Sequence, residues 1–105
     1  MKFVIRPLAR NDILRQYEYY LIEKDAGPAA QRFIPAVQAA VAQLCNTPEI
    51  GALKSLGNAR LAGLRSWHVK GFPDIRVYYL VAKETVRVVR VLHGKRDVES
   101  ILEEE

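Results

Sequence analysis

Hydrophobic and polar positions along the chain follow two different periods, and the change between them divides the sequence into a helical half and a strand-forming half. After a short alternating stretch over residues 2–6, apolar residues recur every three or four positions, from Leu8 to about Lys24 and again from Pro28 to Asn46. This spacing places apolar side chains on one face of a helix. Because the connection between the two stretches is short, we expect an antiparallel helical hairpin.

Two residues of the second helical stretch, Pro35 and Cys45, need separate interpretation. Pro35 lies inside it, where the proline ring removes one backbone hydrogen bond and clashes with the preceding turn, at a cost of about 3 kcal/mol. We therefore expect a kink at Pro35 or a later start of the helix. Cys45 is the single cysteine and lies on the apolar stripe, which predicts a buried core thiol rather than a nucleophile or a disulfide partner.

The second half of the chain changes to alternation with a period of two, which is typical of half-buried strands. After a Gly-containing stretch that reaches Leu61 and that we interpret as a loop, strands are predicted over Leu64–Val69, Ile75–Ala82 and Val86–Leu92. The segments GFPD and AKET separate these strands as turns. Connections this short join antiparallel neighbours, so we predict a three-stranded meander.

A short amphipathic helix is expected to end the chain, from Arg96 to Glu105, with Asp97 and Glu99 in its first turn, where the helix dipole favours negative charge. The N-terminal strand is expected to join one side of the meander, and the helical hairpin to cover one face of the sheet. A chain of 105 residues buries one modest core. We therefore predict a single α+β domain over residues 1–105.

The net charge of +4 is distributed unevenly along the chain. Residues 54–96 contain ten Lys and Arg against two Asp and Glu, whereas residues 97–105 contain five acidic residues and no basic one. A strongly basic block suits a partner that is acidic or carries phosphates, either nucleic acid or an acidic polypeptide. Charge alone does not distinguish such a binding surface from a solvated sheet face that has no partner.

Three groups of residues keep a recognisable order and spacing: the opening strand with Arg6-Pro7, Ala9 and Asp12-Ile13; the stretch Leu64-Arg65-Ser66-Trp67 with Gly71-Phe72-Pro73; and the stretch Arg90-Val91-Leu92-His93-Gly94-Lys95-Arg96-Asp97. On these motifs the chain resembles the ParE/RelE toxin superfamily, and most closely the ParE toxins. The resemblance covers nearly the whole chain. It implies a twisted antiparallel sheet packed on a helical hairpin, and the role of toxin in a bacterial type II toxin–antitoxin pair.

Two activities occur in this superfamily, and the first is that of RelE-like members, which cut messenger RNA on the ribosome. Such members use basic residues on the strands and a tyrosine in the last helix. Arg76 and Arg96 match two of the arginines. The positions of the lysine pair fall approximately on Trp67 and Val69, and the tyrosine position falls near Leu102, which cannot transfer a proton.

RNA cleavage by the neighbouring 2′-hydroxyl also needs a proton acceptor and a proton donor. His93 is the sole plausible general base of the basic region, because an imidazole titrates near neutral pH. On the RelE-like reading the catalytic candidates are therefore His93, Arg76 and Arg96. The alternative for His93 is a structural one, a strand-end histidine whose hydrogen bond holds the turn at Gly94. His68 is assigned the same structural default.

ParE-like members instead poison DNA gyrase by binding, so that broken DNA persists, and they need a surface rather than a proton-transfer set. Candidate contacts with gyrase or the antitoxin are basic or aromatic, since Trp, Tyr and Arg dominate binding hot spots. These candidates are Trp67, Arg76, Arg87, Arg90, Lys95 and Arg96. Trp67 packing in the core and an Arg96–Asp97 turn pair remain alternatives. An inactive protein that only binds antitoxin is a third reading.

The resemblance also implies a cognate antitoxin, whose acidic, partly disordered segment folds on contact by laying a helix in a groove or adding a strand at a sheet edge. No metal or nucleotide motif is present in the sequence, so no cofactor is expected. The N-terminus has three consecutive apolar residues before Arg6, too few for a signal peptide, and no stretch approaches the roughly 20 apolar residues of a membrane span. We expect a cytoplasmic protein without membrane contacts.

Overall fold

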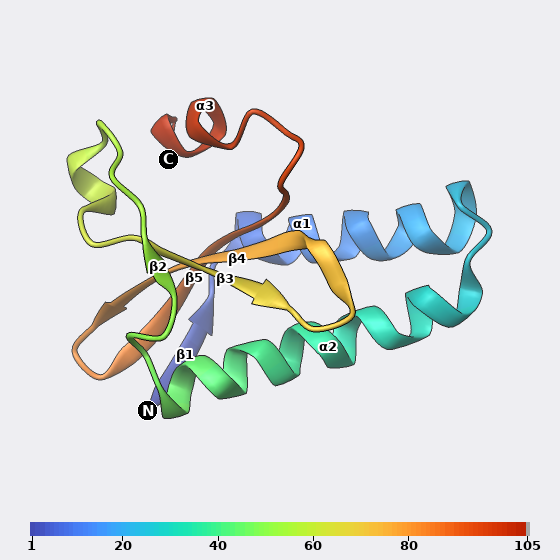
Figure 1. The fold of residues 1–105 in the computed structure, drawn as a ribbon, viewed down its shortest axis with the longest axis horizontal. Helices are drawn as coiled ribbons and strands as arrows, with labels where there is room; N and C mark the ends of the chain where they lie inside the picture. Colours follow the sequence, from blue (N-terminus) through green and yellow to red (C-terminus); the bar gives the residue numbers. More distant parts are fainter. Residues whose placement is uncertain (105) are drawn as a thin grey trace.

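The computed structural model describes residues 1–104 and contains a five-stranded sheet with the strand order β1-β5-β4-β3-β2. Its helices and strands follow the chain as β1 (Lys2–Ile5), α1 (Pro7–Glu18), the π-helical turn η1 (Tyr19–Glu23), α2 (Gly27–Asn46), β2 (Ala52–Leu53), the 3-10 turn η2 (Ala59–Leu61), β3 (Arg65–Val69), β4 (Phe72–Ala82), β5 (Thr85–His93) and α3 (Val98–Glu103). Figure 1 shows the helical hairpin of α1 and α2 on one side of the sheet and α3 across the sheet from α2. The predicted α+β arrangement is confirmed.

The three long strands form the predicted antiparallel meander, and β1 joins it beside β5 in parallel orientation. The short strand β2 was not predicted, because its residues lie in the polar stretch that we interpreted as a loop. It pairs with β3 at Leu53 and Arg65. The Arg65 side chain strengthens this pairing, since its Nη1 donates to the Gly51 carbonyl at 2.7 Å.

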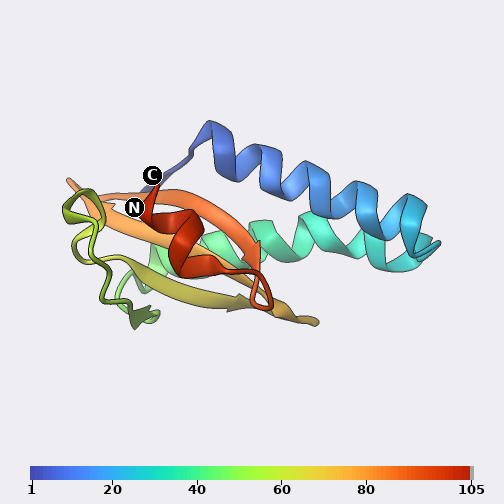
Figure 2. The same cartoon turned by 90° about the horizontal axis from the view of Figure 1, so that it is seen from above.

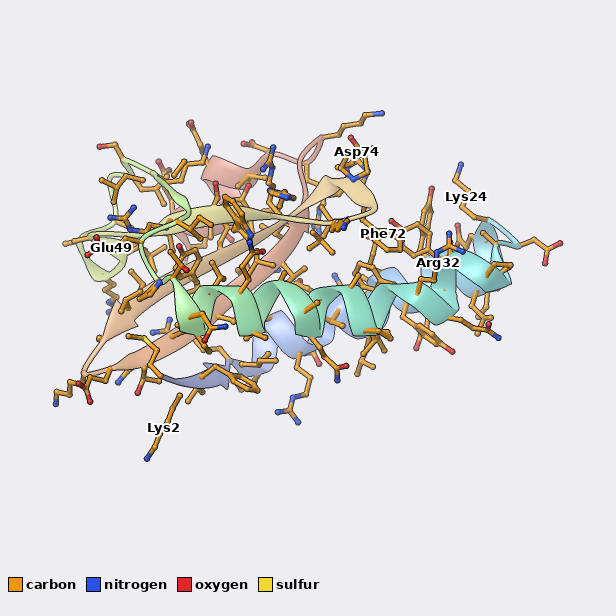
Figure 3. The ribbon with its side chains drawn as sticks, turned by 60° about the horizontal axis from the view of Figure 1, so that its bottom comes forward. Lys2, Lys24, Arg32, Glu49, Phe72 and Asp74 are labelled. Carbon is orange, nitrogen blue, oxygen red and sulfur yellow. The ribbon has the colours of Figure 1, made fainter. Side chains whose placement is uncertain are left out.

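The turn between β3 and β4 is shorter than predicted. Phe72, the second residue of the predicted GFPD turn, already belongs to β4 and pairs with Val69, so the turn consists of Lys70 and Gly71. Gly71 has a φ of +86°, a conformation that glycine adopts without steric cost. Phe72 starts β4 because its ring packs on Phe33 of α2 at 5.2 Å between centroids, and Figure 3 shows it beside that helix.

The helical hairpin differs from the prediction in three details. The first helix ends at Glu18 and continues as the π-helical turn η1 instead of running to Lys24. The second begins at Gly27 and continues through Pro35, so the predicted later start is wrong. Burial of the apolar stripe of α2 offsets the free-energy cost of placing a proline inside the helix. Cys45 packs against the larger core but is half-buried, so the predicted buried core thiol is only partly enclosed.

Two apolar cores lie on opposite faces of the sheet. The larger core joins the hairpin to the strands through side chains such as Phe33, Val37 and Val77. The smaller core, formed by Leu61, Leu64, Tyr78, Val89, Leu92 and Leu102, lies beneath α3. Tyr78 and Tyr79 of β4 pair with Arg90 and Val88 of β5, which leaves Val89 of β5 as an extra residue in a β-bulge. The bulge changes which face the following side chains reach.

Helix α3 is shorter than the predicted helix from Arg96 to Glu105, and Glu105 lies outside the described residues. Asp97 is its N-cap and accepts a hydrogen bond from the Ser100 amide, because a short acidic side chain satisfies an otherwise unpaired N–H there. At the other end, the Asn58 amide donates to the Leu102 carbonyl at 3.3 Å. These contacts and buried Leu102 hold α3 against the sheet.

Candidate functional site

The predicted basic residues converge only in part, in an open cleft of about 660 Å³ over β2, β3, β4 and the loop that follows β5. We call it the basic cleft. Its charged and aromatic lining residues are Lys54, Trp67, His68, Asp74, Arg76, Tyr78 and Lys95. Three of the predicted contact residues, Trp67, Arg76 and Lys95, thus meet there, and Lys54 joins them from the stretch we interpreted as a loop.

The other predicted basic residues lie elsewhere. Arg96 lines an adjoining hollow together with Lys54, Asp97 and Glu99. Arg87 is exposed on β5, where it pairs with Leu80 of β4 on one side and Val4 of β1 on the other, outside the basic cleft. The six candidates therefore do not form a single patch.

Arg90 has a structural partner. Its Nε and Nη2 donate to the two carboxylate oxygens of Asp12 at 2.7 and 2.8 Å, and Asp12 also accepts from the Val91 amide at 3.0 Å. The two side chains are 12% and 3% exposed. This bidentate pair ties α1 to β5 across 78 positions of sequence. Contact of Arg90 with a partner protein stays a prediction.

Trp67 is half-buried and packs against the larger core. Its indole N–H donates to Oε1 of Gln43 in α2 at 3.2 Å, and its ring lies 4.4 Å from the imidazole of His68 between centroids. Packing against the core, the alternative given above for Trp67, thus explains most of the contacts of this side chain. The exposed neighbour His68 is the more accessible ring of the pair.

The two adjacent tyrosines of β4 have different surroundings. The Tyr79 hydroxyl donates to the Pro48 carbonyl at 2.7 Å and accepts from the Gly51 amide at 2.9 Å, which fixes the chain between α2 and β2. Tyr78 is 4% exposed, and no described residue forms a hydrogen bond with its hydroxyl. Burial raises the pKa of Tyr78, although nearby Arg76 opposes the rise.

His93 holds the turn after β5, as the structural alternative predicted. Its Nδ1 accepts from the Lys95 amide at 3.2 Å, and its Nε2 lies 3.8 Å from a carboxylate oxygen of Asp74. The Gly94 amide donates to the Asp74 carbonyl at 2.6 Å, which attaches the same turn to β4. His93 does not line the basic cleft.

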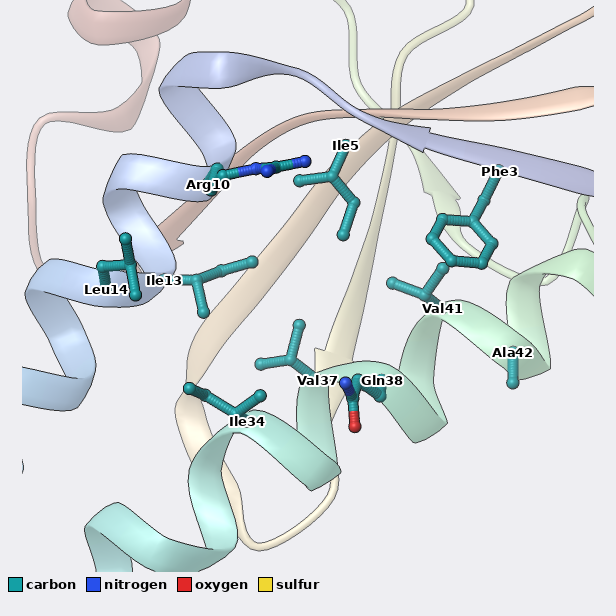
Figure 4. Close-up of a pocket in the computed structure, with 10 residues that line it drawn as sticks. All are labelled: Phe3, Ile5, Arg10, Ile13, Leu14, Ile34, Val37, Gln38, Val41 and Ala42. Atoms are coloured by element: carbon teal, nitrogen blue, oxygen red, sulfur yellow. The ribbon is translucent and has the colours of Figure 1, made fainter.

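A second surface, which the sequence pattern did not locate, is an apolar groove of about 450 Å³ between β1 and the helical hairpin. Figure 4 shows its lining: Phe3, Ile5, Arg10, Ile13, Leu14, Ile34, Val37, Gln38, Val41 and Ala42. Phe3 and Leu14 are 54% and 48% exposed. Both are apolar residues off the buried stripes, which is the signal in the sequence that could have identified this groove.

Among residues 1–104, no group of His, Cys, Asp and Glu side chains is arranged to hold a metal ion. No helix in this part of the chain has the length and apolar character required to cross a bilayer.

Comparisons with known proteins agree with this architecture. A family profile described as "ParE toxin of type II toxin-antitoxin system, parDE" matches residues 3–98. A solved structure described as "Chromosomal ParDE TA system from P. aeruginosa" superposes with a TM-score of 0.57 at 17% identity, over 90% of this chain and 97% of that one. At this identity the superposition shows a shared fold. A search of curated proteins found no significant match.

Proposed function

The chain belongs to the ParE toxin family of type II toxin–antitoxin systems, and from this premise we propose that it inhibits DNA gyrase by binding and is neutralised by its cognate antitoxin. The observation that supports binding rather than catalysis is the make-up of the basic cleft. Lys54, Arg76 and Lys95 supply positive charge, while the predicted general base His93 is held in a turn outside the cleft.

RNA cleavage would require more than positive charge. Each positioned acid or base contributes about 10²- to 10⁴-fold to the rate, and cationic groups supply only charge stabilisation. The raised pKa of Tyr78 keeps its hydroxyl protonated at neutral pH, so this residue is not a base. Among the described residues, His68 is then the one imidazole that lines the basic cleft. Its ring lies beside that of Trp67 on β3, with the two ring planes tilted by 44°.

The apolar groove supports the proposed neutralisation by an antitoxin. Eight of its ten lining residues are apolar, and Arg10 at its side offers a charged contact for an acidic segment. An amphipathic helix that folds on contact buries its apolar face in a groove of this kind. Beside the groove, β1 pairs with β5 on one side and is the edge strand of the sheet on the other, which adds a second mode of attachment.

The test is a DNA gyrase supercoiling assay with the purified toxin, run beside a ribosome-programmed messenger RNA cleavage assay. We expect loss of supercoiling with accumulation of cleaved DNA, reversal by the antitoxin, and intact message. Cut message with normal gyrase activity would overturn the proposal in favour of RNA cleavage. The variant His68→Gln then identifies the base. If the protein binds the antitoxin but neither inhibits gyrase nor cuts messenger RNA, it is an inactive member of the family that has kept only antitoxin binding.

A further inference from the structure

Tyr78 is a buried residue whose hydroxyl forms no hydrogen bond with any of residues 1–104. Its ring is part of the smaller core, and the residue is 4% exposed. Among residues 1–104, no fully enclosed side-chain oxygen or nitrogen lacks a hydrogen bond. The Tyr78 hydroxyl therefore reaches solvent, and the space that its residue lines is the basic cleft and the hollow beside it. A hydrogen-bond donor is thus available where the basic cleft and the hollow beside it share Tyr78.

Within the described part of the chain, the positive charges around this hydroxyl are also without ion-pair partners. Lys54, Arg76 and Lys95 line the basic cleft from three separate segments, and no described carboxylate lies within ion-pair distance of any of them. Among the described residues, Asp74 is the one acidic residue in the lining. Its carboxylate is 60% exposed and is directed towards His93 at 3.8 Å. The cleft therefore keeps an excess of positive charge.

We propose that the basic cleft binds the phosphodiester backbone of DNA, so that the toxin contacts the DNA held by gyrase as well as the enzyme. Phosphate oxygens accept hydrogen bonds from arginine, lysine and neutral hydroxyls alike, and backbone contacts of this kind position a protein without reading sequence. Three cations distributed along an open cleft suit a polyanion with repeated charges. The gyrase context rests on the proposed function, whereas DNA binding by the cleft is testable without gyrase.

The experiment measures binding of a short fluorescein-labelled DNA duplex to the purified full-length toxin by fluorescence anisotropy at several salt concentrations. Arg76→Gln removes one phosphate-contacting cation, and we expect affinity to fall about fivefold or more with a salt slope smaller by about one. Tyr78→Phe removes only the hydroxyl, and we expect a loss of about three- to tenfold at constant ionic strength. Lys95→Gln provides a second charge variant.

Arg87→Gln is the matched control, because Arg87 is an exposed strand arginine of the same sheet outside the cleft. We expect it to lower affinity less than twofold. Equal losses in Arg76→Gln and Arg87→Gln would mean diffuse charge attraction and would overturn the proposal. So would tighter binding of RNA than of DNA of the same sequence, or unchanged binding by both Tyr78→Phe and Lys95→Gln.

The gyrase assay separates this inference from the proposed function. If the cleft variants bind DNA normally but fail to inhibit gyrase, the cleft is not the DNA-binding site, and gyrase is still the target of the toxin. Cleft-dependent DNA binding by a toxin that leaves gyrase untouched would refute the proposed function alone. Circular dichroism and thermal unfolding of each variant confirm that the fold is intact.

Discussion

Asp12 connects the first helix to the last strand through three hydrogen bonds, two from the Arg90 guanidinium and one from the Val91 amide. Removing the carboxylate leaves a largely buried guanidinium without its counter-charge, which typically destabilises a protein by about 3–5 kcal/mol. We expect Asp12→Ala to lower the free energy of unfolding by about that amount, as measured by urea denaturation.

Glu18→Ala is the control for this prediction, because Glu18 is an exposed carboxylate on the same helix. Its removal should change the free energy of unfolding by less than about 0.5 kcal/mol. If Asp12→Ala were as mild as this control, the Asp12–Arg90 pair would not hold α1 to the sheet.

Burial raises the pKa of three tyrosines, Tyr20, Tyr78 and Tyr79. At alkaline pH the unfolded chain therefore releases these protons before the folded chain does, and ionisation favours unfolding. We expect the free energy of unfolding to be unaffected by these groups below the ordinary tyrosine pKa of about 10 and to fall as pH rises above it. Urea unfolding at a series of alkaline pH values tests this, and a flat or rising stability would contradict it.

The segment that joins α2 to β2 depends on close packing around Gly51. A Cβ atom built there would lie 2.5 Å from the Tyr79 hydroxyl and 2.7 Å from the Ser66 carbonyl. Gly51→Ala should therefore displace Tyr79 from its hydrogen bonds. We expect a loss of about 1–3 kcal/mol in the free energy of unfolding, the usual cost of overpacking a buried site.

Gly27→Ala is the matched control, because a Cβ at Gly27 meets no heavy atom within 4 Å. Alanine at this first position of α2 should leave stability unchanged or raise it by up to about 1 kcal/mol, since it restricts the unfolded chain. A similar loss in both variants, measured by thermal unfolding, would show that Gly51 has no special packing role.

The two candidate surfaces share no lining residue and lie towards opposite edges of the sheet, the apolar groove beside β1 and the basic cleft over β2 and β3. Figure 2 shows the helical hairpin extending beyond the sheet, so its tip forms a third exposed region. This separation allows a test of where the antitoxin binds. A charge placed in the apolar groove should affect only that interaction.

Leu14→Glu introduces a carboxylate among the apolar side chains of the groove. We expect it to weaken antitoxin binding at least about tenfold, the loss typical of a binding hot spot, and to leave gyrase inhibition intact. Isothermal titration calorimetry against the purified cognate antitoxin measures the effect. Ile22→Glu is the control, because Ile22 is 70% exposed at the tip of the hairpin and outside the groove. Equal weakening by both variants would place the antitoxin elsewhere.

Helical and strand periods, together with the turn residues, predicted the α+β class, the hairpin, the meander and the short final helix, because each of these depends on the spacing of apolar residues within one segment. The same local reasoning missed β2 and misplaced the start of β4. Both depend on distant partners, Arg65 binding the Gly51 carbonyl in one case and Phe72 packing on Phe33 in the other.

The candidate site was predictable only as a list of residue types. Trp67, Arg76 and Lys95 do line one cleft, but Arg87 lies outside it and Arg90 is bound to Asp12. Basic composition and the order of motifs along the chain were sufficient to indicate a ParE-like toxin domain with a charged surface. Which of those charges meet, and which are bound within the fold, was decided by strand register, the bulge at Val89 and the docking of α1, because these fix contacts between residues far apart in the chain.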